Sequence, residues 1–370
     1  MKKISQLLIL AVVLFVCLSC ASEGTPYFVD KDDDDDDDSG EEDGDLEDSL
    51  EQGESSGEDG DADIHDSVDG DKDNVADGDL DKDSIIEEDV DYDHIPGDSI
   101  TIGTFNVRRY FDTICDSGQC GSNDYEVQLT SSEFDARAEQ IANAINDMDV
   151  DIILLQEIEK AQCVATIRSY LDENYPIYVI GETNYDASLD VAIIAKGERL
   201  QTISHWGEVL HKPNGEVVYF ARDFLEVQLN VNGHKVIVFS AHFKSKANDD
   251  PDRRWAEAAG AYKIVTERAS KSPEALIVFG GDLNDTPGSD PIDEIEKNNK
   301  LLRVASELSD YDAATYYWSG NYQAIDHLFI ANDASGEYIS GTTESVRGQN
   351  GFGLGGSDHA ALKATFELPE

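Results

Sequence analysis

Beyond residue 98 the chain alternates between short apolar runs and longer segments with apolar residues on one helical stripe. Apolar side chains at alternate positions, as at Ile100 and Ile102, are typical of a strand, whereas Ala138, Ile141 and Ile145 recur with helical spacing. The pattern predicts strands at residues 99–107, 151–155, 178–181, 190–195, 222–229, 236–240, 277–279, 324–330 and 360–366, and helices at 134–148, 164–173 and 252–269. Together these elements make one α/β domain at residues 99–370, long enough for a barrel or a layered sandwich.

The first twenty residues have the pattern of an export signal. Lys2 and Lys3 precede an apolar run at residues 7–18, which is too short to span a bilayer. Residues 16–20, Val-Cys-Leu-Ser-Cys, resemble the lipobox of bacterial lipoproteins, which implies that Cys20 is lipidated. We therefore expect residues 1–20 to be a lipoprotein signal peptide and the lipid on Cys20 to anchor the protein at the cell envelope or surface. Plain secretion is the alternative.

Residues 21–98 have the composition of a disordered acidic tether. They include seven consecutive aspartates at residues 32–38, and residues 1–98 carry 35 acidic and 5 basic residues. Such a segment repels itself and has too little apolar surface to form a core. Its aspartate-rich motifs lack the glutamate that completes a calcium-binding loop, so loose cation association is expected there.

The domain that follows is also acidic, with 44 acidic and 22 basic residues at 99–370. This balance argues against broad electrostatic capture of nucleic acid, which needs a basic face. It leaves open a local basic cleft, or a metal site that supplies the positive charge itself.

A polar pair ends the most distinctive strand. Residues 277–279 are apolar, and Gly280 and Gly281 are expected to let the backbone turn tightly. Asp282 and Asn284 then lie on one face, because residues two apart in extended backbone share a face. A carboxylate and a carboxamide in this arrangement suit a divalent metal and a phosphate oxygen. A strand followed by a polar turn is the alternative for this stretch alone.

Other predicted strands begin or end at polar residues too. Residues that can bind a metal or move a proton stand at Asn106, Glu157, His242, Asp326, Asp358 and His359, and basic residues stand near them at Arg108, Arg222 and Lys244. Sites of layered α/β folds gather at such strand ends. A glutamate at the end of an apolar strand, such as Glu157, also needs an arginine or a metal as its partner.

Three cysteines of the domain fit an exported protein. Cys115 and Cys120 bracket a short loop, so a disulfide between them is expected. Cys163 is left over and is expected to be a buried thiol. None of the three has neighbours with metal-ligand spacing.

Taken in order, the strand-end motifs resemble those of the endonuclease/exonuclease/phosphatase superfamily, which has the deoxyribonuclease I-like fold. The resemblance covers about residues 100–368 and rests on Thr-Phe-Asn106-Val-Arg108, Leu-Gln-Glu157, Ser-Ala-His242-Phe-Lys244-Ser, Gly-Gly-Asp282-Leu-Asn284-Asp, Ile-Asp326-His-Leu and Ser-Asp358-His359. It implies a four-layer α/β sandwich, in which two packed mixed β-sheets are flanked by helices.

The resemblance also implies a metal centre and a base. Asn106, Glu157 and Asp358 would surround Mg²⁺, with Mn²⁺ or Ca²⁺ as alternatives. His359, oriented by Asp326, would be the general base for the attacking water. A histidine–aspartate pair is suited to this role because its pKa lies near neutral pH.

The same resemblance implies contacts with the substrate phosphate. Asp282 would bind the metal or position the water, while His242 and Asn284 would stabilise the phosphate at the transition state. Arg222 matches a family position that contacts phosphate, and Asp190 is our candidate for the carboxylate that pairs with His242.

The residues therefore predict an exported, metal-dependent phosphodiester hydrolase, with a nuclease that cleaves extracellular DNA or RNA as the leading hypothesis. Arg108, Arg222 and Lys244 would contact the substrate. The protein is expected to be a monomer, attached to a membrane through Cys20, and no protein partner can be inferred.

Two rival hypotheses remain at this point. A phospholipid or sphingomyelin phosphodiesterase, or an inositol-phosphate phosphatase, would use the same fold; lipid entry usually needs an exposed apolar hairpin, and the sequence shows no clear one. A catalytically silent, cation-binding surface lipoprotein would suit the acidic tether, but it would have no use for the full set of catalytic residue types.

Overall fold

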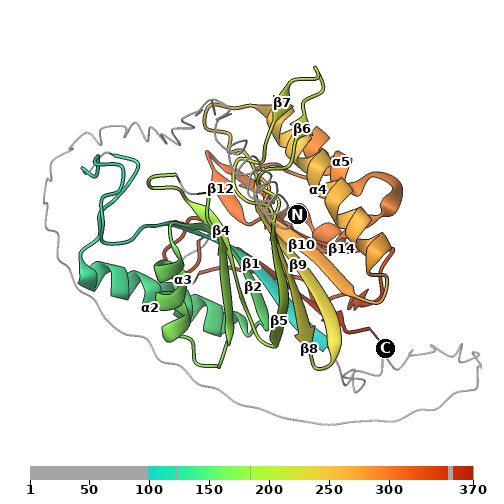
Figure 1. Ribbon diagram of the computed structural model, residues 1–370, viewed down its shortest axis with the longest axis horizontal. Helices are drawn as coiled ribbons and strands as arrows, with labels where there is room; N and C mark the ends of the chain where they lie inside the picture. The colour runs from blue at the N-terminus through green and yellow to red at the C-terminus, as the bar shows by residue number, and fades with distance from the viewer. Residues whose placement is uncertain (1–98, 122–123, 184, 349–352, 370) are drawn as a thin grey trace, which may run out of the picture.

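The computed structural model describes residues 99–121, 124–183, 185–348 and 353–369. Two large sheets pack face to face, and helices cover their outer faces (Figure 1). The predicted signal peptide, the lipidation site at Cys20 and the acidic tether lie outside the described residues. Within the described part, no helix is both long enough and apolar enough to span a membrane.

The first sheet is mixed. Its strands run in the order β15–β17–β1–β2–β4–β3, and β16 also pairs with β17. β1 and β2 are parallel, and the other pairs are antiparallel. The strands are β1 (Ser99–Tyr110), β2 (Ile152–Ile158), β3 (Ile177–Gly181), β4 (Asp190–Ala195), β15 (Glu337–Tyr338), β16 (Glu344–Val346) and β17 (Ala361–Glu367).

The second sheet is also mixed, in the order β11–β14–β10–β9–β8–β5. Here β9 and β10 are the parallel pair, and their neighbours are antiparallel. The strands are β5 (Glu198–Ser204), β8 (Leu225–Val231), β9 (His234–His242), β10 (Leu276–Asp282), β11 (Leu301–Arg303) and β14 (Asp326–Ala331).

Helices form the two outer layers. α2 (Ser131–Met148) and α3 (Ala161–Ser169) cover the first sheet, while α4 (Pro251–Lys271) and α5 (Asp290–Glu296) cover the second. Smaller elements complete the domain: β6 (Leu210–His211), β7 (Val217–Val218), the 3₁₀ turns η1 (Lys297–Asn299) and η2 (Val304–Glu307), α6 (Asp310–Ala313), and the hairpin of β12 (Tyr316–Trp318) and β13 (Asn321–Gln323).

Three apolar cores separate these layers. Leu154 of β2 and Val278 of β10 meet between the sheets, whereas Ile153 packs against α2 and Phe279 packs against α4. Successive residues of β2 thus enter different cores, because side chains alternate between the two faces of a strand. Strands buried on both faces explain the continuous apolar runs in the sequence. The four-layer α/β sandwich is confirmed.

All three predicted helices begin earlier than their apolar periodicity predicts, and in two of them capping fixes the first turn. Thr130 and Glu133 form a capping box at the start of α2. At α4 the Asp250 side chain accepts a hydrogen bond from the backbone N–H of Arg253, and Pro251 occupies the first turn. Each sheet therefore contains one parallel strand–helix–strand unit with a capped helix: β1–α2–β2 in the first and β9–α4–β10 in the second.

The paired glycines of β10 have a different role from the expected turn, so that prediction was wrong. Both lie within the strand, in register with Ser240 and Ala241 of β9. A Cβ added to Gly281 would lie 1.9 Å from the Ala241 carbonyl oxygen, and its φ of 149° suits glycine alone. Glycine is needed here because the neighbouring backbone approaches so closely.

Gly281→Ala is accordingly expected to lower the melting temperature of the full chain by at least about 5 °C, since an overpacked core position costs roughly 1–3 kcal/mol or more. Gly207→Ala is the matched control, because a Cβ at Gly207 meets nothing within 4 Å. Equal melting temperatures for the two variants in a calorimetric scan would contradict this explanation.

The predicted disulfide and the predicted buried thiol are confirmed. Cys115 and Cys120 form a disulfide in the loop that follows β1. Cys163 is a free, buried thiol on α3.

Candidate active site

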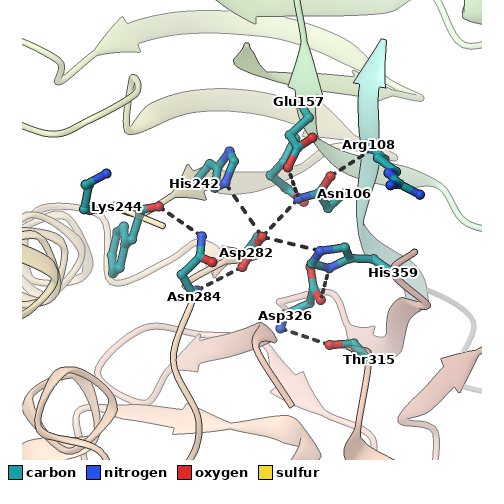
Figure 2. A network of polar contacts seen from close by, with 12 residues as sticks. Asn106, Arg108, Glu157, His242, Lys244, Asp282, Asn284, Thr315, Asp326 and His359 are labelled. Atoms are coloured by element: carbon teal, nitrogen blue, oxygen red, sulfur yellow. Dashed lines mark hydrogen bonds and ion pairs between the residues drawn. The ribbon is translucent and has the colours of Figure 1, made fainter. Parts of the chain in front are cut away.

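The two parallel units bring their carboxyl ends together, and polar side chains from both sheets meet there (Figure 2). Asn106, near the end of the β1–β2 pairing, donates through Nδ2 to Glu157 Oε1 (2.8 Å) and to Asp282 Oδ2 (3.0 Å). Asp282 is the last residue of β10 and lies at the centre of the network. Asn106 therefore connects the carboxylates of the two sheets.

Backbone amides hold these side chains in place. The N–H of Arg109 donates to Glu157 Oε2 (2.8 Å), and that of Asn284 donates to Asp282 Oδ1 (2.9 Å). Arg109, Glu157 and Asn284 all have positive φ, at 46°, 64° and 54°. Left-handed backbone at non-glycine residues is unfavourable and concentrates at functional sites, where the surrounding structure maintains it.

A histidine–aspartate pair lies on one side of Asp282. His359 Nδ1 is 2.8 Å from Asp326 Oδ2, and His359 Nε2 is 3.9 Å from Asp282 Oδ2. The Thr315 hydroxyl accepts from the N–H of Asp326 (3.2 Å), and the Ser357 hydroxyl accepts from the N–H of His359 (3.0 Å). Both members of the pair are thus held by a side-chain hydroxyl.

His242 and Asn284 lie on the other side of Asp282. His242 Nε2 is 3.7 Å from Asp282 Oδ2, and Asn284 Nδ2 donates to the carbonyl of Phe243 (3.1 Å). The Asn284 side chain thus lies on the same side of Asp282 as His242, opposite His359 (Figure 2).

Burial and neighbouring charges shift the pKa values of the site residues. Burial alone would lower the pKa of His359, but the negative charges of Asp326, Asp282 and Asp358 raise it to about 10, above the near-neutral value expected from the sequence. Burial, together with the charge of Asp326, raises the pKa of Asp282 to about 7. Burial lowers the pKa of His242 well below its ordinary value, and the nearby positive charge of Arg222 adds to this. His242 is therefore neutral at neutral pH.

Comparison with known proteins assigns the chain to a family. Residues 101–342 match the model of the Endonuclease/Exonuclease/phosphatase family. The chain belongs to this family. It is a hydrolase of phosphoric esters.

Individual relatives are distant. The 5'-tyrosyl-DNA phosphodiesterase of Caenorhabditis elegans is 25% identical over 266 residues, which cover 65% of this chain and 67% of the relative. The solved endonuclease/exonuclease/phosphatase from Beutenbergia cavernae DSM 12333 has a TM-score of 0.51 and 15% identity, over 74% of this chain and 72% of that one. A functionally unknown conserved protein from Enterococcus faecalis V583 has a TM-score of 0.52 and 17% identity, over 73% and 100%. The solved structures show the shared fold.

The residues of this family member fit a divalent metal ion. Ligand atoms of Glu157, His242 and Asp282 lie within 4.8 Å of one another, and so do those of Asp282, Asp326 and His359. Asp326 Oδ1 is buried and has no hydrogen-bond partner among the described residues. Oxygen-rich sets of this kind suit Mg²⁺, Mn²⁺ or Ca²⁺. A cation beside Asp282 would also stabilise the charged carboxylate that burial disfavours.

The structure places the remaining predicted residues around this centre. Asp358 lies outside both ligand sets, and its carboxylate forms an ion pair with Arg108 (3.6 Å) at the exposed mouth of the site. Arg222 is nearly buried and close enough to His242 to lower its pKa. Lys244 is also buried, and its ammonium donates to the carbonyl of Ala247 (3.0 Å), which turns it away from Asp282 (Figure 2).

Asp190 does not pair with His242, so that prediction was wrong. Its carboxylate accepts from the hydroxyls of Thr183 and Ser188, both at 2.8 Å. His242 Nδ1 has no hydrogen-bond partner in the described part of the chain, and the carboxylate nearest its Nε2 belongs to Asp282.

The sequence reasoning missed an aromatic hairpin beside the site. Tyr316 of β12 packs on His359 with ring centroids 4.8 Å apart, and Trp318 stacks on Tyr316 at 6.5 Å. Trp318, Tyr317 and Tyr322 are each about half exposed or more, at 60%, 46% and 50%. The run Tyr316-Tyr317-Trp318 is the sequence feature that could have indicated this hairpin. It is too short to show periodicity, and it lies outside the strand-end motifs.

Asp326→Asn provides a test of the histidine–aspartate pair. A protonated His359 cannot accept a proton, so kcat/KM should rise with pH with a midpoint above the ordinary histidine value of about 6.5. Loss of the Asp326 charge lowers the pKa of His359, and we expect the midpoint to move to lower pH while kcat falls by about 10²-fold or more. An unchanged midpoint in the variant's pH–rate profile would show that His359 does not carry the titrating proton.

Proposed function

We propose that this hydrolase cleaves phosphodiester bonds of nucleic acid, DNA or RNA, with Mg²⁺ as its preferred metal. The observation that carries the proposal is the aromatic stack that leads outward from His359 through Tyr316 to Trp318. Unpaired bases stack on such exposed rings with little dependence on sequence, and each stacked base contributes roughly 1–3 kcal/mol. The name of the Caenorhabditis elegans relative, which acts on tyrosyl-DNA, supports the same substrate class.

In the proposed reaction the residues on the two sides of Asp282 have different roles. Asn106, Glu157 and Asp282 would hold the metal, which when bound neutralises the phosphodiester charge as a Lewis acid. His359 Nε2 faces the centre while Asp326 fixes its Nδ1, so His359 in its deprotonated form is placed to take a proton from the attacking water. His242 and Asn284 donate hydrogen bonds to the phosphate as charge develops on its oxygens. Arg108, which pairs with Asp358 at the mouth, would contact the phosphates of the substrate strand.

A substrate panel tests the proposal. The full chain, freed of metal by a chelator, is incubated with plasmid, single-stranded DNA, RNA, and vesicles of sphingomyelin or phosphatidylcholine, each with Mg²⁺, Mn²⁺ or Ca²⁺. We expect metal-dependent cleavage of nucleic acid. Release of phosphocholine without nucleic-acid cleavage would replace the proposal by the lipid alternative.

One structural observation also favours the lipid alternative. The hairpin of β12 and β13 exposes tryptophan and tyrosine side chains, which also favour a membrane interface. Replacement of Tyr317, Trp318 and Tyr322 by alanine tests whether these rings bind nucleic acid or a membrane. On single-stranded DNA it should raise KM about tenfold or more with a smaller effect on kcat. Tyr170→Ala, another exposed tyrosine, is the control.

We further propose that the enzyme works outside the cytoplasm, anchored through Cys20 and separated from the membrane by residues 21–98. The support is the lipobox-like ending at residues 16–20 and the acidic composition of the segment that follows. Cys20→Ala should move the protein from the membrane fraction to the medium. An unchanged membrane fraction would exclude this anchor.

A further inference from the structure

A second group of carboxylates lies away from the active site, where the loop after β1 meets the end of β2. Asp112 and Asp116 come from the start of this loop, Glu126 from its return, and Glu159 from the residue after β2. One oxygen each of Asp116, Glu126 and Glu159 lies within 4.8 Å of the other two. Glu126 and Glu159 are almost completely buried, although both are acidic.

The loop backbone orients these carboxylates. Glu126 accepts from the N–H groups of Asp116 and Ser117, both at 2.7 Å, and Glu159 Oε2 accepts from the N–H of Asp112 (2.7 Å). The Cys115–Cys120 disulfide closes the turn that carries Asp116. A carboxylate oxygen that accepts one hydrogen bond still has a lone pair for a cation. The group is thus arranged before any ligand arrives.

A separate observation, an oxygen without a hydrogen-bond partner, indicates that the group binds a ligand. Glu159 Oε1 is buried and has no hydrogen-bond partner among the described residues. The ammonium of Lys160 lies 3.9 Å away, beyond hydrogen-bond range. A buried carboxylate oxygen without a partner is costly, so native proteins supply one.

Lys160 does not balance the charge of the group. Its ammonium contacts Asp112 (3.4 Å) and Asp116, in addition to its ion pair with Glu159. It therefore brings one positive charge to a group of four carboxylates, counting Glu126. Its side chain is 35% exposed, so it can move into solvent when another cation enters.

We propose that Asp116, Glu126 and Glu159, with Asp112 beside them, form a binding site for Ca²⁺, separate from the catalytic centre. Separations of up to 4.8 Å between donor oxygens match two ligands on opposite sides of an ion with Ca–O distances of roughly 2.3–2.6 Å. Calcium suits the group better than Mg²⁺, because it accepts irregular geometry and sheds its water more readily. The ion would fasten the loop to the end of β2, two residues beyond Glu157.

The test measures calcium-dependent stability of the full chain. It is done in the Asp282→Asn background, so that the catalytic centre contributes less to the response. Addition of 10 mM CaCl₂ to chelator-treated protein should raise the melting temperature by roughly 3–8 °C, as expected for a dissociation constant of about 0.1–1 mM. Adding Asp116→Asn and Glu126→Gln should reduce this rise to below about 1 °C. Asp147→Asn, an exposed acid on α2, is the matched control and should leave it intact.

Lys160→Met separates a calcium site from a closed network in which Lys160 is the permanent counter-ion. Without calcium this variant should melt below the parent, because four carboxylates lose their cation. With calcium it should recover fully and bind the ion about tenfold more tightly in a calorimetric titration. Failure of calcium to restore Lys160→Met, or an undiminished response in the Asp116→Asn/Glu126→Gln variant, would overturn the proposal.

Discussion

Replacement of His359 by alanine is expected to lower kcat on the preferred substrate by about 10²–10⁴-fold, with little change in KM. The reason is the position of the imidazole: Nδ1 is fixed 2.8 Å from Asp326 Oδ2, while Nε2 faces Asp282 at 3.9 Å. His242 is neutral and could also accept a proton, but its Nδ1 has no hydrogen-bonded carboxylate among the described residues to stabilise the imidazolium that would form. Steady-state kinetics with saturating Mg²⁺ measures the effect.

The matched control is His211→Ala, which removes an exposed histidine of β6. It should keep the full rate. Equal melting temperatures of the two variants would show that the loss reflects chemistry and not unfolding. A His359→Ala enzyme with the kcat of the parent would mean that the proposed base is misassigned, whichever substrate is used.

Glu157→Gln is expected to raise the Mg²⁺ concentration needed for half-maximal activity by at least about tenfold. The carboxylate lies in one ligand set with His242 and Asp282, and glutamine keeps its shape while removing its charge. The hydrogen bond from Asn106 Nδ2 to the side chain can persist, so the fold should be preserved. Activity measured against total metal, from chelator to 50 mM Mg²⁺, gives the shift.

Glu139→Gln, an exposed glutamate of α2, should leave the metal requirement unchanged. Chelator should abolish the activity of both enzymes, and Mg²⁺ should restore it. Identical metal curves for the parent and Glu157→Gln would remove Glu157 from the metal centre and leave the Asn106 side chain and the Arg109 amide as the groups that stabilise its half-buried charge.

Much of this arrangement could be predicted from the sequence, because the central strands are buried on both faces. Such strands read as uninterrupted apolar runs, and a polar residue that ends one of them, such as Glu157 or Asp282, stands out. The parallel pairing of β1 with β2 and of β9 with β10 then forces those ends to the same edge. Local pattern and topology agree here, so the strand-end reasoning led to the site.

The parts that could not be predicted depend on contacts between distant segments. β5 is an edge strand whose seven residues are almost all exposed, so it has no apolar signature. The direction of the Lys244 ammonium depends on the Ala247 carbonyl, and the partners of Asp190 proved to be the hydroxyls of Thr183 and Ser188. The strand glycines were misread for the same reason: the sequence shows a flexible residue but not the backbone that approaches it.

The bonds that complete the catalytic centre also join the two halves of the sandwich. Asn106 of the first sheet donates to Asp282 of the second, and His359, just before β17, pairs with Asp326 of β14. Neither sheet carries a working set of groups by itself. Catalytic turnover therefore reports the docking of the two sheets, and during refolding it should return only after the secondary structure has already formed.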